Sequence, residues 1–452
     1  MGWSVEGISV MAKGWIAAAW IGVAAVVAAP VPGHAKSLEE VVGATIAVHP
    51  EVKRDQALNR AAEEFIDEQF SGYLPTLDLD AGTGYEFTNS PATRSRNGVA
   101  RNEPAHRDLW RSDLQLRLNQ MVFDGFATRS GVRSARADRD AAIERIAETN
   151  QRIGFRAVEV FLEVLRSQDV VGLADENVAA HEDIVRRVRA QVDAGVADSV
   201  DLEQGAARMA LSRSERSRRM GGLRRANVQF TEVVGEAPEG LELPAAPDYD
   251  QPIDVDTAIS DALEDNPTVA VTAARARART HDIGVTRAPY FPRFDIELTG
   301  TTINNLDGIL GPNTTFSALL RMRYNLFRGF FDRASKRRAT FEAAAAADDD
   351  SEARRSIRED VRVAYQALLT AQVRLAPLRQ RVESSRRTLE AYYGQYDIGR
   401  RSLFDLLDTQ NELFRSSVDL VDGNFAVLLG HHRLLFTMGW LLQSLGVEPA
   451  TG

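Results

Sequence analysis

The stretch Phe123-Asp124-Gly125-Phe126 decides the fold of this 452-residue chain, because it returns later as Phe327-Arg328-Gly329-Phe330. Each copy is followed by an arginine at the same distance, Arg129 and Arg333. The copies lie 204 residues apart, and other pairs share this spacing: Phe161 with Tyr365, Gln168 with Gln372, Gly195 with Gly399, and Asp201 with Asp405. One match can arise by chance, but several in one register indicate an internal duplication.

The duplication extends upstream of these motifs. Leu38 to Pro50 matches Val255 to Pro267, and Tyr73-Leu74-Pro75 matches Tyr290-Phe291-Pro292. The offset here is 217, so the first half is predicted to hold a loop thirteen residues longer than its counterpart. The polar stretch Thr88 to Asp108 fits that loop.

Each half has the same order of patterns. A helical pattern (Leu38 to Ser71, Val255 to Arg287) ends just before Pro75 or Pro292. Two runs then alternate apolar and polar residues, which is typical of a strand with one apolar face. The apolar positions are Leu77, Leu79, Ala81, Tyr85 and Phe87, then Trp110, Leu114, Leu116 and Leu118, and in the second half Phe294, Ile296 and Leu298, then Phe316, Ala318, Leu320, Met322 and Tyr324. Four strands of about ten residues have the length that crosses a bilayer when tilted.

A long helix is predicted after each Phe-x-Gly-Phe motif. Thr128 to Ala194 contains no proline over 67 residues, which would span about 100 Å as a helix. Leu38 to Ser71 and Ser199 to Thr231 are each about half as long, so that the two stacked end to end would match one long helix. The halves are separated by a Pro-rich linker, 236–253.

The sequence therefore divides into a signal peptide (1–35), a first helix-strand-strand-helix repeat (36–235), the linker (236–253), a second repeat (254–447) and a tail (448–452). In the signal peptide, Lys13 precedes an apolar run from Trp15 to Ala29, and small residues follow it. We expect cleavage after Ala35. Fifteen apolar residues are few for a membrane helix, but an uncleaved N-terminal anchor is the alternative.

Composition excludes several classes of protein. Cysteine is absent, which removes disulfides, cysteine metal sites, thiol catalysis and cysteine-linked lipid anchors. The net charge is −10, with 64 acidic and 54 basic residues, so that a general nucleic-acid binder is excluded. A charged fraction of 26% and a hydrophobic fraction of 44% exclude a disordered chain and a multi-span helical membrane protein.

If the four amphipathic strands of an exported chain lie in a membrane, the edges of their sheet must be paired with other strands. Open sheet edges do not occur in hydrocarbon, and the smallest spanning barrels have about eight strands. Several copies are therefore expected to contribute strands to one barrel around a common axis. The alternative is a soluble sheet with long coiled-coil helices.

The duplicated order, the prolines before the strands, and the motifs Phe123 to Arg129 and Gly195 to Asp201 resemble the outer-membrane efflux (TolC-like) family. The resemblance covers Ser37 to about Val447. It implies an α+β membrane protein, in which a homotrimeric transmembrane β-barrel with four strands per chain continues into a long periplasmic α-helical barrel. It implies no catalytic activity, cofactor or metal, and it implies three partners: outer-membrane lipid, a periplasmic membrane-fusion adaptor and an inner-membrane pump.

The motif best carried across from the family is Tyr396 to Asp408. Asp405 and Asp408 resemble the aspartates that ring the periplasmic constriction. Three chains would place six carboxylates around one axis, and such a ring attracts cations and opposes anions. The alternative is that both are solvated residues at a helix start, stabilised by the helix dipole.

Other residues of this end also resemble family positions. Tyr396 and Arg401 resemble residues that latch the closed gate onto an aspartate of the other hairpin, and Asp201 occupies that position. An arginine can bind such a carboxylate through two hydrogen bonds. The helical turns at Gly195 and Gly399 are implied to dock the adaptor.

Four further features receive simpler interpretations. The pair His431-His432 is predicted to lie on the surface, because adjacent helical residues face different directions. The run Asp348 to Asp350 is predicted to be a solvated helix face, and the arginines of Arg213 to Arg225 to pair with Glu215 and its neighbours. An aromatic girdle is expected from Tyr85, Phe87, Trp110 and Phe316.

The cargo is inferred only from the resemblance. Leu162 to His181, Gly195 to Gln204 and Val234 to Pro238 are similar to the type I secretion branch, which exports large unfolded proteins with an ABC pump. The first alternative is small-molecule efflux with a proton-driven (RND-type) pump. An alternative of another class is a trimeric surface stalk without a conducting pore.

Overall fold

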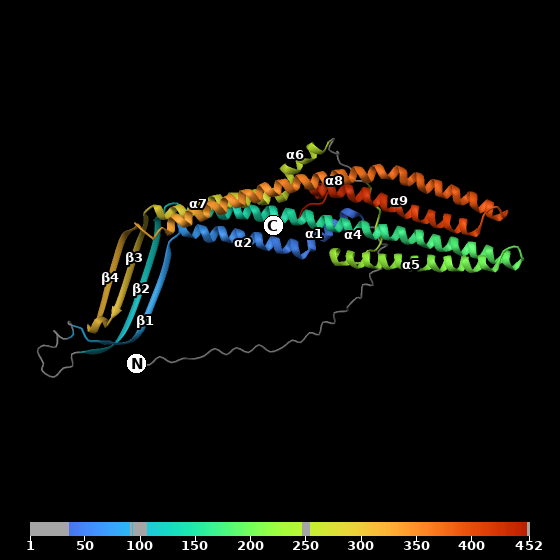
Figure 1. The fold of residues 1–452 in the computed structure, drawn as a ribbon. Coiled ribbons are helices and arrows are strands. Elements are labelled where there is room, and N and C mark those ends of the chain that lie inside the picture. The colour runs from blue at the N-terminus through green and yellow to red at the C-terminus, as the bar shows by residue number, and fades with distance from the viewer. Residues whose placement is uncertain (1–35, 91–92, 94–105, 246–253, 450–452) are drawn as a thin grey trace, which may run out of the picture.

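The computed structural model describes residues 36–90, 93, 106–245 and 254–449. The signal peptide with its expected cleavage after Ala35, part of the linker and the last three residues lie outside the described residues. The molecule is elongated, with a sheet at one end and parallel helices running away from it (Figure 1).

Each expected first helix is in fact two helices. The first repeat has α1 (Leu38–Val48) and α2 (Pro50–Phe70), and the second has α6 (Val255–Asp265) and α7 (Pro267–Arg287). The break falls at His49-Pro50 and Asn266-Pro267, because a residue before proline is driven out of the helical region. The side chains of His49 and Asn266 then cap the following helix.

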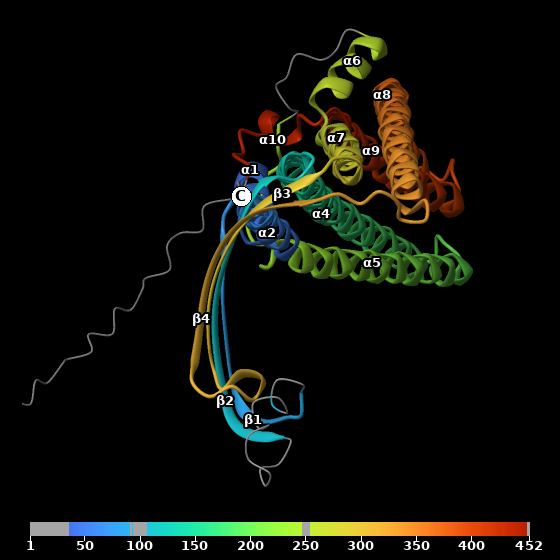
Figure 2. The same cartoon turned by 90° about the vertical axis from the view of Figure 1, so that its left-hand side faces the viewer.

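Four antiparallel strands form one sheet in the order β1-β2-β3-β4. The bounds are β1 (Thr76–Thr88), β2 (Arg107–Phe123), β3 (Arg293–Asn304) and β4 (Pro312–Arg323). The sheet curves away from the helices as an arc (Figure 2). The repeats meet at its centre, where β2 pairs with β3, and β1 and β4 are its edges.

The helices that follow the strands have the same lengths in the two repeats. The long helices are α4 (Ala127–Asp193) and α8 (Phe331–Asp397), of 67 residues each, and α5 (Ser199–Val234) and α9 (Leu403–Met438) have 36 each. Helices α4 and α5 form one long hairpin, and α8 and α9 form another beside it (Figure 1). The family-typical α+β order predicted from the sequence is confirmed.

The main core lies midway along the molecule, where α1, α4, α5, α9 and the short α10 (Leu441–Ser444) meet. Phe161 and Phe230 are among the largest fully buried side chains there. Among the described residues, no helix is long and apolar enough to cross a membrane.

The prediction that His431 and His432 lie on the surface is wrong. Their exposed fractions are 6% and 1%. Helix α9 is packed against both α8 and α4, so that little of its surface is left for solvent. Neither ring nitrogen of His432 has a hydrogen-bond partner, and burial lowers the pKa of His432 to about 4. The described residues hold no group of His, Asp and Glu fit to bind a metal.

Stability is therefore expected to fall in mild acid. His432 is neutral in the folded chain but takes up a proton below pH 6.5 when unfolded, so acid favours the unfolded state until pH is about 4. The loss is roughly 3 kcal/mol per chain, at 1.36 kcal/mol for each pH unit. His432→Leu should flatten the stability measured by chemical denaturation between pH 7 and 4.5.

The matched control is His106→Leu, because the side chain of His106 is 41% exposed. Burial also lowers the pKa of His49, His181 and His431, so that a residual slope is expected in His432→Leu. An acid loss in His432→Leu as steep as in the parent chain would contradict the assignment.

Candidate functional site

The end of the molecule farthest from the sheet consists of two tight turns (Figure 1). One joins α4 to α5 at Gly195, and the other joins α8 to α9 at Gly399. Both glycines have positive φ, +73° and +70°, a backbone conformation that suits glycine. No atom lies within 4 Å of a Cβ built on either glycine, so both turns are open to a partner.

Asp405 lies in the first turn of α9 and works as part of its cap. Its backbone N–H donates to Ser402 Oγ at 3.2 Å, and Ser402 Oγ donates back to Asp405 Oδ2 at 2.9 Å. Arg401 lies 3.8 Å from the same carboxylate. In the single chain, the geometry of Asp405 thus fits the alternative of a helix-start acid held by the dipole.

Asp408 lies one turn further along α9 and differs from Asp405. It is exposed, and within the described part of the chain it forms no hydrogen bond or ion pair. Its carboxylate therefore faces solvent without a compensating cation within the described chain. Of the two aspartates, Asp408 is the one whose side chain has no partner among the described residues.

Tyr396 connects the two hairpins. Its hydroxyl donates to Gln191 Oε1 at 2.9 Å, so the tyrosine of α8 is bound to the end of α4. Burial raises the pKa of Tyr396, and the nearby Asp201 raises it further. Asp201 is thus close enough to affect the pKa of Tyr396, but among the described contacts it is Gln191 that accepts the hydrogen bond from the Tyr396 hydroxyl.

Arg401 is held within its own hairpin. Its Nε donates to Gln395 Oε1 at 3.0 Å, and its guanidinium carbon lies 4.3 Å from the centre of the Tyr392 ring. In the described chain it does not contact Asp201. The predicted latch between Arg401 and Asp201 stays a prediction.

Gln191 and Gln395 are the residues of this end that motif comparison did not single out. They lie 204 residues apart and are therefore equivalent in the two repeats. Each side chain accepts one hydrogen bond from a proposed latch residue, and each carbonyl accepts one from the turn, from Val196 or Arg400. The repeat spacing was the signal that could have found them.

An apolar cluster supports this end from behind. Ile184 and Val188 of α4 pack against Leu403, Leu406 and Leu407 of α9. These five side chains are nearly fully buried, with exposed fractions of at most 3%. The cluster fixes the first turn of α9 against α4.

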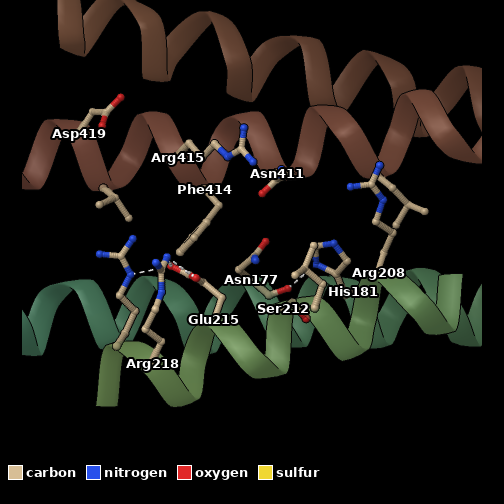
Figure 3. A pocket seen from close by; sticks show the side chains of 14 residues that line it. Asn177, His181, Arg208, Ser212, Glu215, Arg218, Asn411, Phe414, Arg415 and Asp419 are labelled. Carbon is tan, nitrogen blue, oxygen red and sulfur yellow. Dashed lines mark hydrogen bonds and ion pairs between the residues drawn. The ribbon is translucent and has the colours of Figure 1, made fainter. Parts of the chain in front are cut away.

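A cavity of about 220 Å³ lies between α9 and the α4–α5 hairpin (Figure 3). His181 Nδ1 lies 2.8 Å from the carbonyl of Asn177, and Gln410 Nε2 donates to Asn177 Oδ1 at 3.2 Å. Arg208 and Arg415 also line the cavity. Neither forms an ion pair within the described part of the chain, whereas Glu215 and Asp419, which also line the cavity, are paired with arginines.

The strand residues expected to face lipid are exposed in the single chain. Tyr85, Phe87, Trp110 and Phe316 are 62–74% exposed. Tyr85 pairs with Trp110, and all four lie toward the end of the sheet away from the helices. They therefore do not pack in the chain's own core, in keeping with the expected girdle.

The charged runs of the helices behave mostly as expected. Arg218 and Arg219 both pair with Glu215 on α5. Asp348 and Asp349 are exposed, whereas Asp350 is half-buried and accepts a hydrogen bond from Thr272 Oγ1 at 2.9 Å. Part of the acidic run thus joins α8 to α7.

Comparison with known proteins gives a consistent result. A family model described as outer membrane efflux protein matches residues 41–236 and 258–439. The outer membrane efflux protein BepC of Brucella suis is 23% identical over 427 residues, which cover 92% of this chain and 93% of that protein.

Two further proteins extend the comparison. The alkaline protease secretion protein AprF of Pseudomonas aeruginosa is 23% identical, over 88% of this chain and 81% of that protein. The crystal structure of the Campylobacter jejuni CmeC outer membrane channel matches with a TM-score of 0.78 at 15% identity, over 89% of this chain and 86% of that one. The fold is therefore that of outer-membrane channels.

Proposed function

The chain belongs to the outer membrane efflux protein family, and from this premise we propose that it is the passive, gated exit duct of a type I protein secretion system. It is an outer-membrane protein that extends into the periplasm, it is the outer-membrane channel of a tripartite system, and it is not an enzyme. The finer assignment to protein secretion rests on the likeness to AprF, whose name describes protease secretion.

The duct is a homotrimer. One chain supplies a curved sheet of four strands with both edges open, and such a sheet cannot stay in lipid until its edges are paired. Three chains close a barrel, and their three pairs of hairpins continue it as a helical tube. The exposed apolar strand face then contacts lipid.

The far tips of the hairpins are the gate and the docking site. Asp405 and Asp408 from three chains form the acidic ring of the gate, and Tyr396, Arg401 and Asp201 form its latch. We include Gln191 and Gln395 in the latch, because they accept hydrogen bonds from Tyr396 and Arg401. The open turns at Gly195 and Gly399 dock the periplasmic adaptor, which links the duct to an ABC pump. Exposed apolar side chains beside them, such as Val200 and Phe404, support a contact there.

Weakening the latch is expected to raise the current through the closed channel. Each lost hydrogen bond removes about 1 kcal/mol of support for the closed arrangement, so Tyr396→Phe with Arg401→Ser should raise the closed-state current at least several-fold in planar bilayers. Gln191→Leu should mimic Tyr396→Phe.

Tyr393→Phe is the matched control for this experiment. It removes a hydroxyl from the neighbouring residue, which has no hydrogen bond in the described chain, so that the closed-state current should not change. If the latch variants conduct like the parent channel, the latch assignment is wrong.

The secretion assignment is tested by an inventory of secreted proteins. Mass spectrometry of culture supernatant would compare a deletion strain with its parent and with a complemented strain. Selective loss of one or a few very large proteins, restored by complementation, is the expected result. An unchanged supernatant would instead favour small-molecule efflux, the reading that the name of BepC supports, and an absence of ion conductance would favour a stalk.

A further inference from the structure

The two repeats are equivalent in sequence but not in burial. Helix α4 buries 25 of its 67 residues, whereas α8, of the same length, buries eight. The difference arises because α4 packs against α2 of its own repeat and also against α7 of the second repeat, whereas α8 packs against α7 of its own repeat and has no comparable helix on its other side within the described chain. The surface of α8 that corresponds to the α7-facing surface of α4 is therefore exposed in the single chain.

The turn between strand and long helix shows the same difference at atomic detail. A Cβ built on Gly125 would lie 2.5 Å from the carbonyl oxygen of Ala288 and 3.0 Å from Phe291 Cβ. Gly329, its equivalent, has no atom within 4 Å. The side chains around it are exposed, with Phe327 at 70% and Phe330 at 68%.

The missing neighbour can be identified from the duplication. Gly125 of the first repeat contacts Ala288 to Phe291 of the second, and the first-repeat equivalent of that segment is Ser71 to Leu74. In the same chain, Ser71 to Leu74 lies at the opposite edge of the sheet from Gly329. The same contact can therefore form only with a second copy of the chain.

The pairing register of β4 of one chain with β1 of a second copy follows from the same repeat offsets. Inside the chain, β2 pairs with β3 so that Leu118 lies opposite Leu298. Moving β2 forward by 204 gives β4, and moving β3 back by 217 gives β1. Met322 then lies opposite Ala81 of a second copy, and Arg323 lies opposite Asp80.

The positions of the apolar residues in the two strands agree with this register. Apart from Leu319 and the first residue, Pro312, the apolar residues of β4 that follow the alternation are even-numbered (Phe316, Ala318, Leu320, Met322), and those of β1 are odd-numbered (Leu77, Leu79, Ala81, Tyr85, Phe87). Directly opposed residues share a face of the sheet, so an even residue must face an odd one. The derived register does this throughout and places Phe316 opposite Phe87.

The charged face of the sheet adds an independent observation. Near the helices, β1 carries Asp78 and Asp80, and β2 carries Arg117. The next strand, β3, carries Asp295 and Glu297, which bind Arg321 and Arg323 of β4. The acidic residues of β1 and β3 thus alternate with the arginines of β2 and β4, except that Arg293 of β3 lies opposite Arg323 and is itself bound by Asp295. Asp78 and Asp80 form no ion pair within the described part of the chain.

We propose that this alternating belt of charge specifies the seam between subunits, joining β4 of one chain to β1 of the next in the register Arg323–Asp80 and Met322–Ala81. The inference rests on the proposed trimer and deepens it. At this seam a basic β4 meets an acidic β1, as the arginines of β4 meet the acidic residues of β3 inside the chain. Pairing of β1 with β1, or of β4 with β4, would oppose like charges, which is destabilising across strands.

The belt therefore selects a head-to-tail ring over a two-fold dimer. A two-fold contact puts the same patch on both sides, whereas a ring joins two different patches. The lipid-facing residues do not distinguish a ring from a two-fold dimer, because both edge strands have an apolar outer face. The charged inner face is what distinguishes the two edges.

The seam is tested by cysteine cross-linking in the membrane, which suits a chain that has no cysteine of its own. Ala81→Cys with Met322→Cys places the Cα atoms of opposed residues about 4.5–5.5 Å apart, within the range that a disulfide spans. Mild oxidation should give covalent trimers on a non-reducing gel. Ala81→Cys with Leu320→Cys is the control, displaced by two residues, and should give at least several-fold less.

Two outcomes would overturn the seam. One is a higher yield from the displaced pair than from the matched pair, and the other is abundant covalent dimers from Ala81→Cys or Met322→Cys alone. A variant that conducts ions in bilayers yet never cross-links would also refute the seam while leaving the duct intact. A covalent trimer that does not conduct ions would support the seam and refute the proposed duct.

A second variant tests the charge itself. Asp80→Arg puts an arginine opposite Arg323 of the next chain, while inside its own chain it faces the neutral Gln115. The yield of covalent trimer from the matched cysteine pair should fall several-fold, and Asp80→Asn should fall between the two. An Asp80→Arg chain that cross-links like the parent pair would show that the belt does not specify the seam.

Discussion

Replacing Asp408 with asparagine is expected to remove most of the cation preference of the channel. The ratio of K⁺ to Cl⁻ permeability, taken from the reversal potential in a KCl gradient, should fall by about tenfold. A carboxylate within about 4 Å of an ion contributes about 1 kcal/mol even in water, and three such groups act on one axis. Asp405→Asn should lower the ratio less.

The two aspartates differ because of their contacts. Asp405 exchanges hydrogen bonds with Ser402 and lies near Arg401, so that part of its field is already compensated. Its loss should instead weaken the start of α9 by about 0.5–1 kcal/mol, the usual range for a cap. Asp408 has no such partner in the described chain, and its removal should leave stability unchanged.

Glu390→Gln is the matched control for charge. It removes one negative charge from an exposed position of α8, in the same hairpin. The permeability ratio should then stay near that of the parent channel. A fall equal to that of Asp408→Asn would mean that total charge, rather than a ring at the tip, sets the selectivity.

The second large effect is expected at the turn between sheet and helices. Gly125→Ala should abolish most of the protease-resistant trimer recovered from the outer membrane. A Cβ at Gly125 would overlap the carbonyl oxygen of Ala288 at 2.5 Å, and the backbone has φ +71°. Left-handed strain and overpacking together cost about 2–5 kcal/mol, which is comparable to the whole stability of many domains.

Gly329→Ala separates the two sources of strain. Its φ is +57°, but nothing in its own chain lies near the added Cβ. If Ser71 to Leu74 of the next chain covers this turn, trimer recovery should fall nearly as far as in Gly125→Ala. Gly172→Ala, in open space within α4, should recover trimer fully, because alanine favours a helix over glycine. Full recovery of Gly329→Ala trimers would leave that turn uncovered.

The sequence alone was sufficient for the element order. The spacing of Phe123 to Phe126 and Phe327 to Phe330 aligned two halves whose helices then agree in length to the residue. Alternation located all four strands, because a sheet with one apolar face leaves a period of two. The break at His49-Pro50 is visible in the sequence as a proline, but the helical pattern from Leu38 to Ser71 runs across it and does not by itself mark a boundary between two helices.

The contacts at the tip were not predictable in the same way. Tyr396 ends α8 near the turn and Arg401 follows the turn, but their partners Gln191 and Gln395 are ordinary glutamines in the long polar helices α4 and α8. The burial of His431 and His432 was missed because it depends on α9 being covered by α4 and α8. Such burial is a property of packing between hairpins, which a local pattern does not report.

The pairing of β2 with β3 also determines when the sheet can form. The hairpins β1–β2 and β3–β4 are local in sequence, but between Phe123 and Arg293 the chain runs through α4, α5, α6 and α7. Because bringing distant segments together costs loop entropy, such pairings form late. The newly exported chain is thus expected to carry two separate hairpins with open apolar edges, the kind of surface that aggregates. Productive folding then depends on completing the second half before the first meets another copy.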